Sequence, residues 1–140
     1  MSTRSNIIIK NGRTEILLYR HCDGYLTGTG QDLVNDLMVS DYDNVNGYFN
    51  LAKFTKKLLD QDTDYRIDNQ FGGDIEYLYT FEFEDSYEDA RHYNRVKLKS
   101  IEVDQDVGFG KGGKRKFKTL SEFLDAINKA RKEVGIKWNI

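Results

Sequence analysis

The regular alternation of side chains from residue 75 to residue 84 constrains the fold of this chain more than any other feature of its sequence. Apolar residues occupy every second position, and most of the positions between them are polar or charged. Successive side chains of a strand point to opposite faces, so this pattern predicts a strand with one buried and one solvated face. The residues expected on the buried face are Ile75, Tyr77, Tyr79, Phe81 and Phe83.

A second strand is expected at residues 95–103, which also carry regularly spaced apolar side chains. The spacing slips by one position near Ser100, which predicts a register break such as a β-bulge. A polar turn separates the two runs, so we expect them to pair as a hairpin. The chain is also expected to open with a hairpin, in which Asn11-Gly12 forms a type I′ turn between residues 6–9 and 15–19.

Three segments have apolar residues at helical spacing, and each needs a surface to cover. These helices are expected at Gln31 to Met38, Asn50 to Leu59 and Leu120 to Val134. Thr119 and Glu122 match a capping box at the start of the last one, and a brief strand is expected at residues 65–67. Because the helices and hairpins do not alternate regularly, residues 1–140 are predicted to form a single α+β domain, an antiparallel sheet with about three helices on one face.

Composition and charge exclude several classes of protein. The 140 residues are 39% hydrophobic and 13% aromatic, which supports a buried core and excludes wholesale disorder. The net charge of −2 creates no global field that would attract nucleic acid or a membrane. No apolar run approaches the ~20 residues needed to cross a bilayer. Residues 1–10 lack a secretion signal, and a single cysteine agrees with a reducing compartment, so we expect a cytoplasmic protein without membrane contact.

The most distinctive candidate site is the segment from residue 20 to residue 30, where a strand ends and glycines lead toward a helix N-terminus. Unpaired N–H groups at such a position favour an anion or another acceptor-rich ligand. The candidate ligand-binding residues are Arg20, His21, Asp23, Gly24, Tyr25, Gly28 and Gly30. Alternatively, the glycines form a tight turn, and Thr29 or Asp32 caps the helix and occupies the same N–H groups.

The chemistry of a catalytic or metal site is not indicated. Cys22 and His21 are neighbours on a strand, where adjacent side chains point to opposite faces, and they match no nucleophile signature. His21, Cys22 and His92 lack the spacing of a zinc site. The aspartates of residues 62–68 lack the glycine and the bidentate glutamate of a calcium loop. We therefore assign no catalytic residue, metal or cofactor, and catalysis is not the favoured interpretation.

Positive charge is concentrated in a glycine-rich segment at residues 111–118. The five cations there are Lys111, Lys114, Arg115, Lys116 and Lys118. A loop of this kind can bind phosphates without reading a nucleic-acid sequence. Alternatively, it is a flexible hairpin tip whose lysines keep the protein soluble.

The acidic remainder of the chain offers a different surface, because several tyrosines lie within it. These are Tyr65, Tyr77, Tyr79, Tyr87 and Tyr93. Tyrosine buries a large area while it keeps a polar group, so such a surface would suit a basic groove on a partner protein.

Two short segments of the N-terminal third resemble a group of small hypothetical proteins that are common in phages and prophages. The first is Ser2-Thr3-Arg4-Ser5, and the second is Tyr19-Arg20-His21-Cys22-Asp23-Gly24-Tyr25 with Gly30 after it. In that group the pattern runs roughly Thr-Arg-Ser, hairpin, Tyr-x-His-Trp-Asp-Gly-Tyr, so Cys22 stands where the group usually has Trp. The resemblance implies a viral accessory gene but no particular activity. Small size and composition also suit phage counter-defence proteins, including anti-CRISPR inhibitors.

Three hypotheses about function follow. The first is a non-catalytic, phage-type accessory protein that inhibits a host protein by occupying it, or that captures a small ligand. The second is a nucleic-acid-binding accessory protein that uses residues 111–118. The third is a small nucleotide-directed enzyme or nucleotide-binding protein with its site at residues 20–30.

Overall fold

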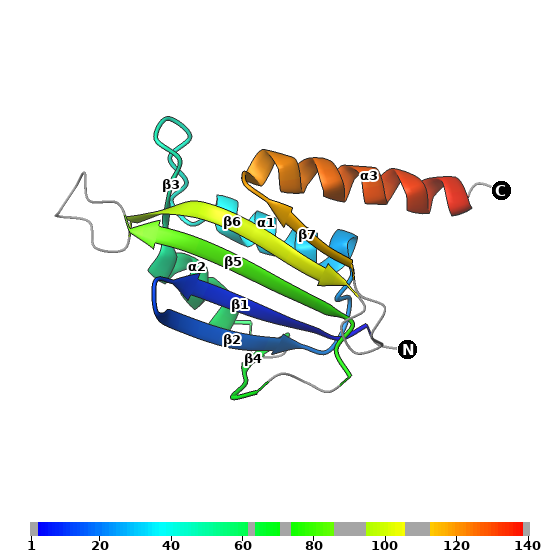
Figure 1. Ribbon diagram of the computed structural model, residues 1–140, viewed down its shortest axis with the longest axis horizontal. Coiled ribbons are helices and arrows are strands. Elements are labelled where there is room, and N and C mark those ends of the chain that lie inside the picture. Colours follow the sequence, from blue (N-terminus) through cyan, green and yellow to red (C-terminus); the bar gives the residue numbers. More distant parts are fainter. Residues whose placement is uncertain (1–2, 62–63, 71–73, 86–94, 106–112, 139–140) are drawn as a thin grey trace.

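The computed structural model describes residues 3–61, 64–70, 74–85, 95–105 and 113–138, with side chains up to residue 133, and shows a mixed β-sheet with three α-helices (Figure 1). The strands are β1 (Ser5–Asn11), β2 (Thr14–Arg20), β3 (Tyr48–Asn50), β4 (Tyr65–Ile67), β5 (Tyr77–Asp85), β6 (Arg95–Gln105) and β7 (Gly113–Phe117). The helices are a single π-helical turn η1 (Leu26–Gly30), α1 (Gln31–Met38), α2 (Leu51–Leu59) and α3 (Leu120–Trp138).

The two strands predicted from apolar spacing pair as expected, because β5 and β6 form an antiparallel hairpin. Tyr79, Phe81 and Phe83 are buried on one face of β5. The predicted register break is also present, since Glu82 pairs with Ser100 whereas the next residue, Phe83, pairs with Leu98. Ile75 is buried but precedes the strand, which begins two residues later than the alternation predicted.

The prediction of a purely antiparallel sheet is wrong, because β1 and β5 run parallel to each other. The strand order is β3-β6-β5-β1-β2-β4, and β7 pairs with β6. Parallel neighbours need a long crossover connection, which here contains α1 and α2. The β1–β2 and β5–β6 hairpins each join strands that are neighbours in the sequence, so the turn residues indicate them. The pairing of β1 with β5 is instead set by packing across the crossover.

The first hairpin turns one residue later than predicted. Asn11 pairs with Thr14, so the central residues are Gly12 and Arg13. Of these two, only Gly12 has a positive φ, of 62°. A positive φ at the first central residue alone is typical of a type II′ turn and not of the predicted type I′ turn.

All three predicted helices are confirmed, and their N-terminal caps explain where two of them begin. Asn50 precedes α2, and its side chain accepts a hydrogen bond from the Lys53 backbone N–H at 3.0 Å. Thr119 precedes α3, and its hydroxyl accepts one from the Glu122 backbone N–H at 3.2 Å. Within the described ranges, no helix has both the length and the apolar content needed to span a membrane.

The core lies between the helices and one face of the sheet, which we call the helix-covered face. Phe54 of α2 and Phe123 of α3 each place their ring 6.0 Å from the ring of Phe81 on β5. Leu33 and Leu37 of α1 belong to the same buried cluster. The other face, which we call the open face, has charged and partly exposed residues along the central strands.

We expect Phe81→Ala to lower the free energy of unfolding by about 3–5 kcal/mol, because it leaves a cavity where rings from two helices meet. Thr80→Ala, on the open face of the same strand, should cost less than about 1 kcal/mol. Urea titrations monitored by circular dichroism would measure both values. Similar losses for the two variants would contradict this assignment of the faces.

Candidate functional site

The candidate segment at residues 20–30 begins in a turn that packs tightly against the start of β1. The Gly24 N–H donates to the Thr3 carbonyl at 2.9 Å, and the buried Tyr79 hydroxyl donates to the Gly24 carbonyl at 2.6 Å. A Cβ atom on Gly24 would lie 2.9 Å from the Thr3 oxygen. The residues before β1 and the turn after β2 therefore contact each other, and close backbone packing accounts for Gly24.

Asp23 then holds the beginning of the helical segment through its backbone. Its φ is 59°, and its carbonyl accepts hydrogen bonds from the Thr29 N–H at 2.7 Å and from the Thr29 hydroxyl at 2.9 Å. A Cβ atom on Gly28 would lie well inside 3.0 Å of this carbonyl. Helical backbone starts at Leu26, so Gly28 and Gly30 lie within η1 and not in a loop before the helix. The glycines do precede α1, as predicted, but in a π-helical turn instead of the expected loop.

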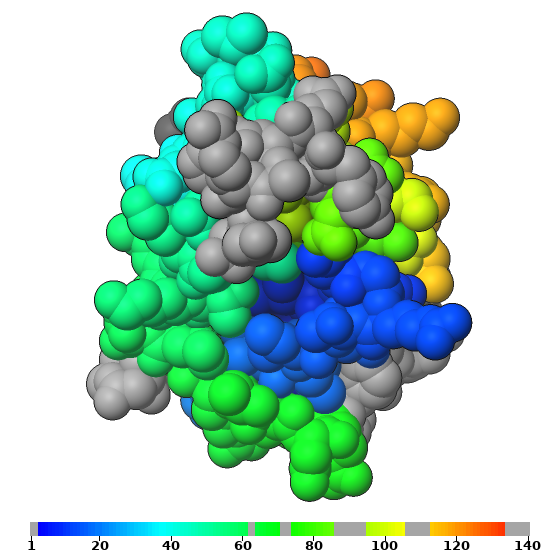
Figure 2. Space-filling model, turned by 90° about the vertical axis from the view of Figure 1, so that its left-hand side faces the viewer, coloured from blue at the N-terminus to red at the C-terminus, as the bar shows by residue number. Residues whose placement is uncertain are grey.

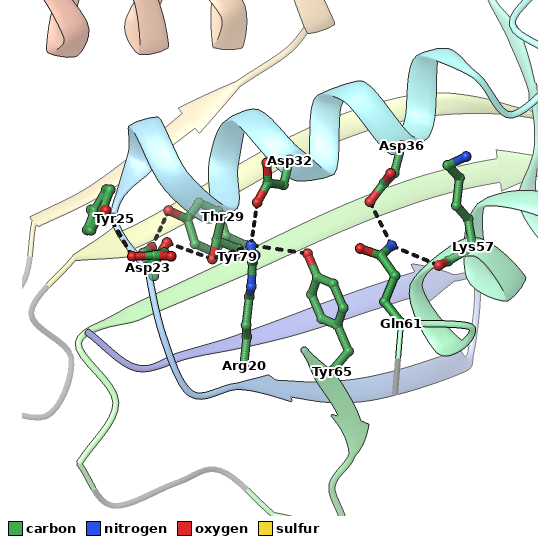
Figure 3. A network of polar contacts seen from close by, with 11 residues as sticks. Arg20, Asp23, Tyr25, Thr29, Asp32, Asp36, Lys57, Gln61, Tyr65 and Tyr79 are labelled. Carbon is green, nitrogen blue, oxygen red and sulfur yellow. Dashed lines mark hydrogen bonds and ion pairs between the residues drawn. The ribbon is translucent and has the colours of Figure 1, made fainter. Parts of the chain in front are cut away.

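Arg20 cross-links three elements on the helix-covered side, as Figure 3 shows. Its Nη1 donates to Asp32 at 2.8 Å, to Thr29 at 3.1 Å and to the Tyr65 hydroxyl at 3.4 Å. Burial of Arg20 lowers the pKa of its guanidinium, but the electrostatic effects of Tyr65 and Asp32 are together larger, so the pKa is raised. These partners engage Arg20 within the protein, so its position indicates a role in joining β2 to η1, α1 and β4. Tyr65 was not among the residues expected near Arg20.

His21 does not share the surroundings of Arg20. It is exposed, and its Nδ1 is 2.9 Å from the hydroxyl of Tyr19, whose ring lies 4.4 Å from the Arg66 guanidinium carbon. Cys22 is also exposed. Among the residues described, no group of three or more His, Cys, Asp or Glu side chains is arranged to hold a metal ion. Arg20 and His21 therefore make separate contacts.

The basic segment is partly a strand and not the predicted loop. Lys114 and Lys116 pair with Asp104 and Glu102 of β6, on the open face. Arg115 points to the helix-covered face, where its guanidinium carbon lies 5.8 Å from the centre of the Phe117 ring. Lys118 follows the strand, and Lys111 is outside the described residues. The cations are thus divided between two faces, and those on the open face lie next to acidic residues.

The predicted surface of tyrosines does not form as expected. Tyr65 and Tyr79 are buried in the core, and Tyr77 is partly buried. Tyr87 and Tyr93 are outside the described residues. Burial of Tyr65 raises the pKa of its hydroxyl, so this group stays neutral and serves as a partner for Arg20.

The two candidate segments meet at a pocket of about 760 Å³. Tyr25, Leu26 and Thr27 line it from the first segment, and Arg115 lines it from the basic segment. Tyr77 and Gln105, which pair at the ends of β5 and β6, complete the sheet side. The remaining lining residues come from α3 and are Ala126, Lys129, Ala130 and Glu133.

On α3 the pocket is lined by small apolar residues. Ala126 and Ala130 are partly buried and line it, whereas Phe123 and Ile127 of the same helix are fully buried in the core. Tyr25 and Arg115 were among the candidates predicted from the sequence, but the lining residues of α3 were not. The alanines among the larger residues of the apolar stripe of α3 were the signal that could have found them.

The polar groups around the pocket are suited to binding. Arg115 and Lys129 form no ion pair within the described part of the chain. The Tyr25 hydroxyl donates to Asp23 at 2.9 Å, and this hydrogen bond raises the pKa of the tyrosine. Tyr25 is 41% exposed, so its ring remains accessible. The arrangement offers aromatic surface, two cations, one amide and one carboxylate to a ligand.

We expect Gly28→Ala to destabilise the protein by about 1–3 kcal/mol, because the added methyl group collides with the Asp23 carbonyl. Gly113→Ala is the matched control, since nothing lies within 4 Å of its Cβ position, and it should change stability by less than about 0.5 kcal/mol. Chemical denaturation would compare them. If Gly28→Ala left the free energy of unfolding unchanged, the turn at Asp23 would not be packed as described.

Comparison of the chain with models of protein families, with curated proteins and with solved structures found no match.

Proposed function

We propose that this chain is a non-catalytic binding protein that captures a small ligand in the pocket between η1, the ends of β5–β7 and α3. The observation that carries this proposal is that the two segments singled out by their sequence, far apart in the chain, contribute Tyr25 and Arg115 to the same pocket. A volume of about 760 Å³ lies within the range of roughly 300–1,000 Å³ typical of ligand sites.

The chemistry of the lining supports binding without catalysis. His21 and Cys22 do not line the pocket, and Arg20 is engaged with Asp32 and Tyr65. Among the lining residues that the structure describes, Glu133 is the one carboxylate, and no histidine or cysteine is present to act with it. General acid–base and nucleophilic catalysis both need a second positioned group, which this lining does not supply.

Ala130→Trp should abolish ligand binding, because the indole would fill the space that Ala130 leaves between α3 and the sheet. The measurement is the shift of melting temperature on adding each member of a panel of metabolites. A ligand at 100 times its Kd stabilises the native protein by about 2.7 kcal/mol. We expect at least one such shift in the wild type and none in Ala130→Trp.

Ala52→Trp is the matched control, because Ala52 is an exposed alanine on α2. It should respond to the ligand as the wild type does. The proposal would be abandoned if no compound stabilised the wild type, or if the Ala130→Trp variant responded as strongly as Ala52→Trp.

A second candidate function, inhibition of a host protein, is favoured by the arm at residues 41–47. This segment projects beyond the sheet next to β3 (Figures 1 and 2). Asp43 Oδ1 accepts from the Val45 and Asn46 N–H groups at 2.9 and 3.4 Å, and the Gly47 N–H donates to the Asp43 carbonyl at 2.7 Å. Val45 is 85% exposed on this braced turn. A preorganised apolar side chain of this kind binds a partner at a low entropic cost.

Val45→Asp should remove a stoichiometric protein that the wild-type chain retains from a lysate of the host cell. Ile67→Asp is the control, because Ile67 is an exposed apolar residue, 65% accessible, on the edge strand β4. Affinity capture followed by mass spectrometry would compare the three baits. Retention of the same protein by Val45→Asp would refute a docking role for the arm.

A further inference from the structure

We propose that the ligand of the pocket is a mononucleotide, whose base lies against the tyrosines and whose phosphate lies between Arg115 and Lys129. This inference rests on the proposed function, since it names the chemical class of the ligand captured there. It uses three observations: two positioned aromatic rings, two cations that form no ion pair with any described residue, and small residues on α3 that line the space between them.

The aromatic rings are held before a ligand arrives. The ring of Tyr77 is nearly parallel to that of Tyr79, with 6.0 Å between centroids and 10° between planes. Tyr25 is held by its hydrogen bond to Asp23, and its ring packs closely on Gly28, where a Cβ atom would lie 2.9 Å from the Tyr25 Cε2 atom. Stacking on an aromatic side chain stabilises a bound nucleic-acid base and tolerates any base, because every base has a π-face.

The cations come from two different elements that line the pocket, Arg115 from β7 and Lys129 from α3. Arg115 is oriented by its contact with the Phe117 ring, which packs in turn on Phe123 with 5.4 Å between centroids. A guanidinium binds phosphate through two parallel hydrogen bonds, and an ammonium adds a point charge. Among the described lining residues, two cations outnumber the single carboxylate of Glu133, which favours an anionic group such as a phosphate monoester.

The remaining polar groups fit the sugar or the edge of a base. The Gln105 amide can both donate and accept hydrogen bonds, and the Glu133 carboxylate can accept them from ribose hydroxyls or an exocyclic amine. A simple anion such as phosphate would use the cations but not the aromatic surface. An uncharged aromatic compound would use the rings but leave two cations without a partner. A mononucleotide would contact both the aromatic rings and the cations.

Isothermal titration calorimetry should test the proposal with AMP, GMP, CMP and UMP, the matching nucleosides, inorganic phosphate and a 5′-phosphorylated trinucleotide. We expect at least one monophosphate to bind at a ratio of 1:1. Its nucleoside and free phosphate should each bind at least tenfold more weakly. Arg115→Ser and Lys129→Ser should each raise the Kd of the monophosphate at least tenfold.

Lys114→Ser is the matched control, because Lys114 is next to Arg115 on β7 but faces the other side of the sheet. It should leave the Kd within twofold, and melting temperatures should show that all three variants are folded. Equal effects of Lys114→Ser and Arg115→Ser would overturn the proposal. So would a trinucleotide that binds more than tenfold tighter than the monophosphate, since the ligand would then be a nucleic-acid strand.

The failure of this inference can be distinguished from the failure of the proposed function. If no mononucleotide binds but another compound stabilises the wild type and not Ala130→Trp, the pocket is a ligand site and its assignment to nucleotides is wrong. If no compound stabilises the wild type at all, both proposals fail.

Discussion

The packing of the Asp23-Gly24 turn against the start of β1 is the constraint on which the rest of the site depends. Gly24 has no space for a side chain beside Thr3, and its carbonyl is held by the hydroxyl of the fully buried Tyr79. The Asp23 carbonyl then binds the backbone and the side chain of Thr29, so helical structure begins at Leu26. This early start brings Tyr25, Leu26 and Thr27 to the pocket. Tight backbone contacts of this kind leave little freedom, so the position of the Tyr25 ring is set by the fold before any ligand binds.

Local features of the fold were predictable because each was encoded by neighbouring residues. The alternation before Phe83, the cap at Asn50 and the register slip near Ser100 all depend on contacts within one element or one hairpin. The parallel pairing of β1 with β5 was not predictable, because it joins residues some 72 positions apart, as in the pair of Ser5 with Tyr77. Sequence patterns record which residues are buried, but they carry little information on which strand lies next to which. The basic segment was mistaken for a loop because lysines and glycine on an edge strand have the same composition as a solvated turn.

The candidate site was predictable in part. Tyr25 and Arg115 were both singled out, yet their meeting depends on the position of α3 against the sheet. Arg20 and His21 were both assigned to one ligand site, but consecutive residues of an extended chain point to opposite sides, and the two make separate contacts. The glycines were interpreted as sites where a ligand approaches the backbone, whereas Gly24 and Gly28 are crowded by the protein's own carbonyl groups. A glycine in a sequence does not show whether a ligand or the protein's own backbone occupies the space that a side chain would need.

The most direct test of the account is an NMR titration, in which amide and side-chain resonances are followed as a mononucleotide is added to the full chain. The account predicts chemical-shift changes that are concentrated at residues 25–27, Gln105, Arg115 and residues 126–133, and that saturate with a single Kd. Resonances of the arm at residues 41–47 and of Lys114 should remain nearly unchanged. Changes centred on the arm or on the open face, with none at Tyr25 and Arg115, would contradict the claim that this pocket is the functional site.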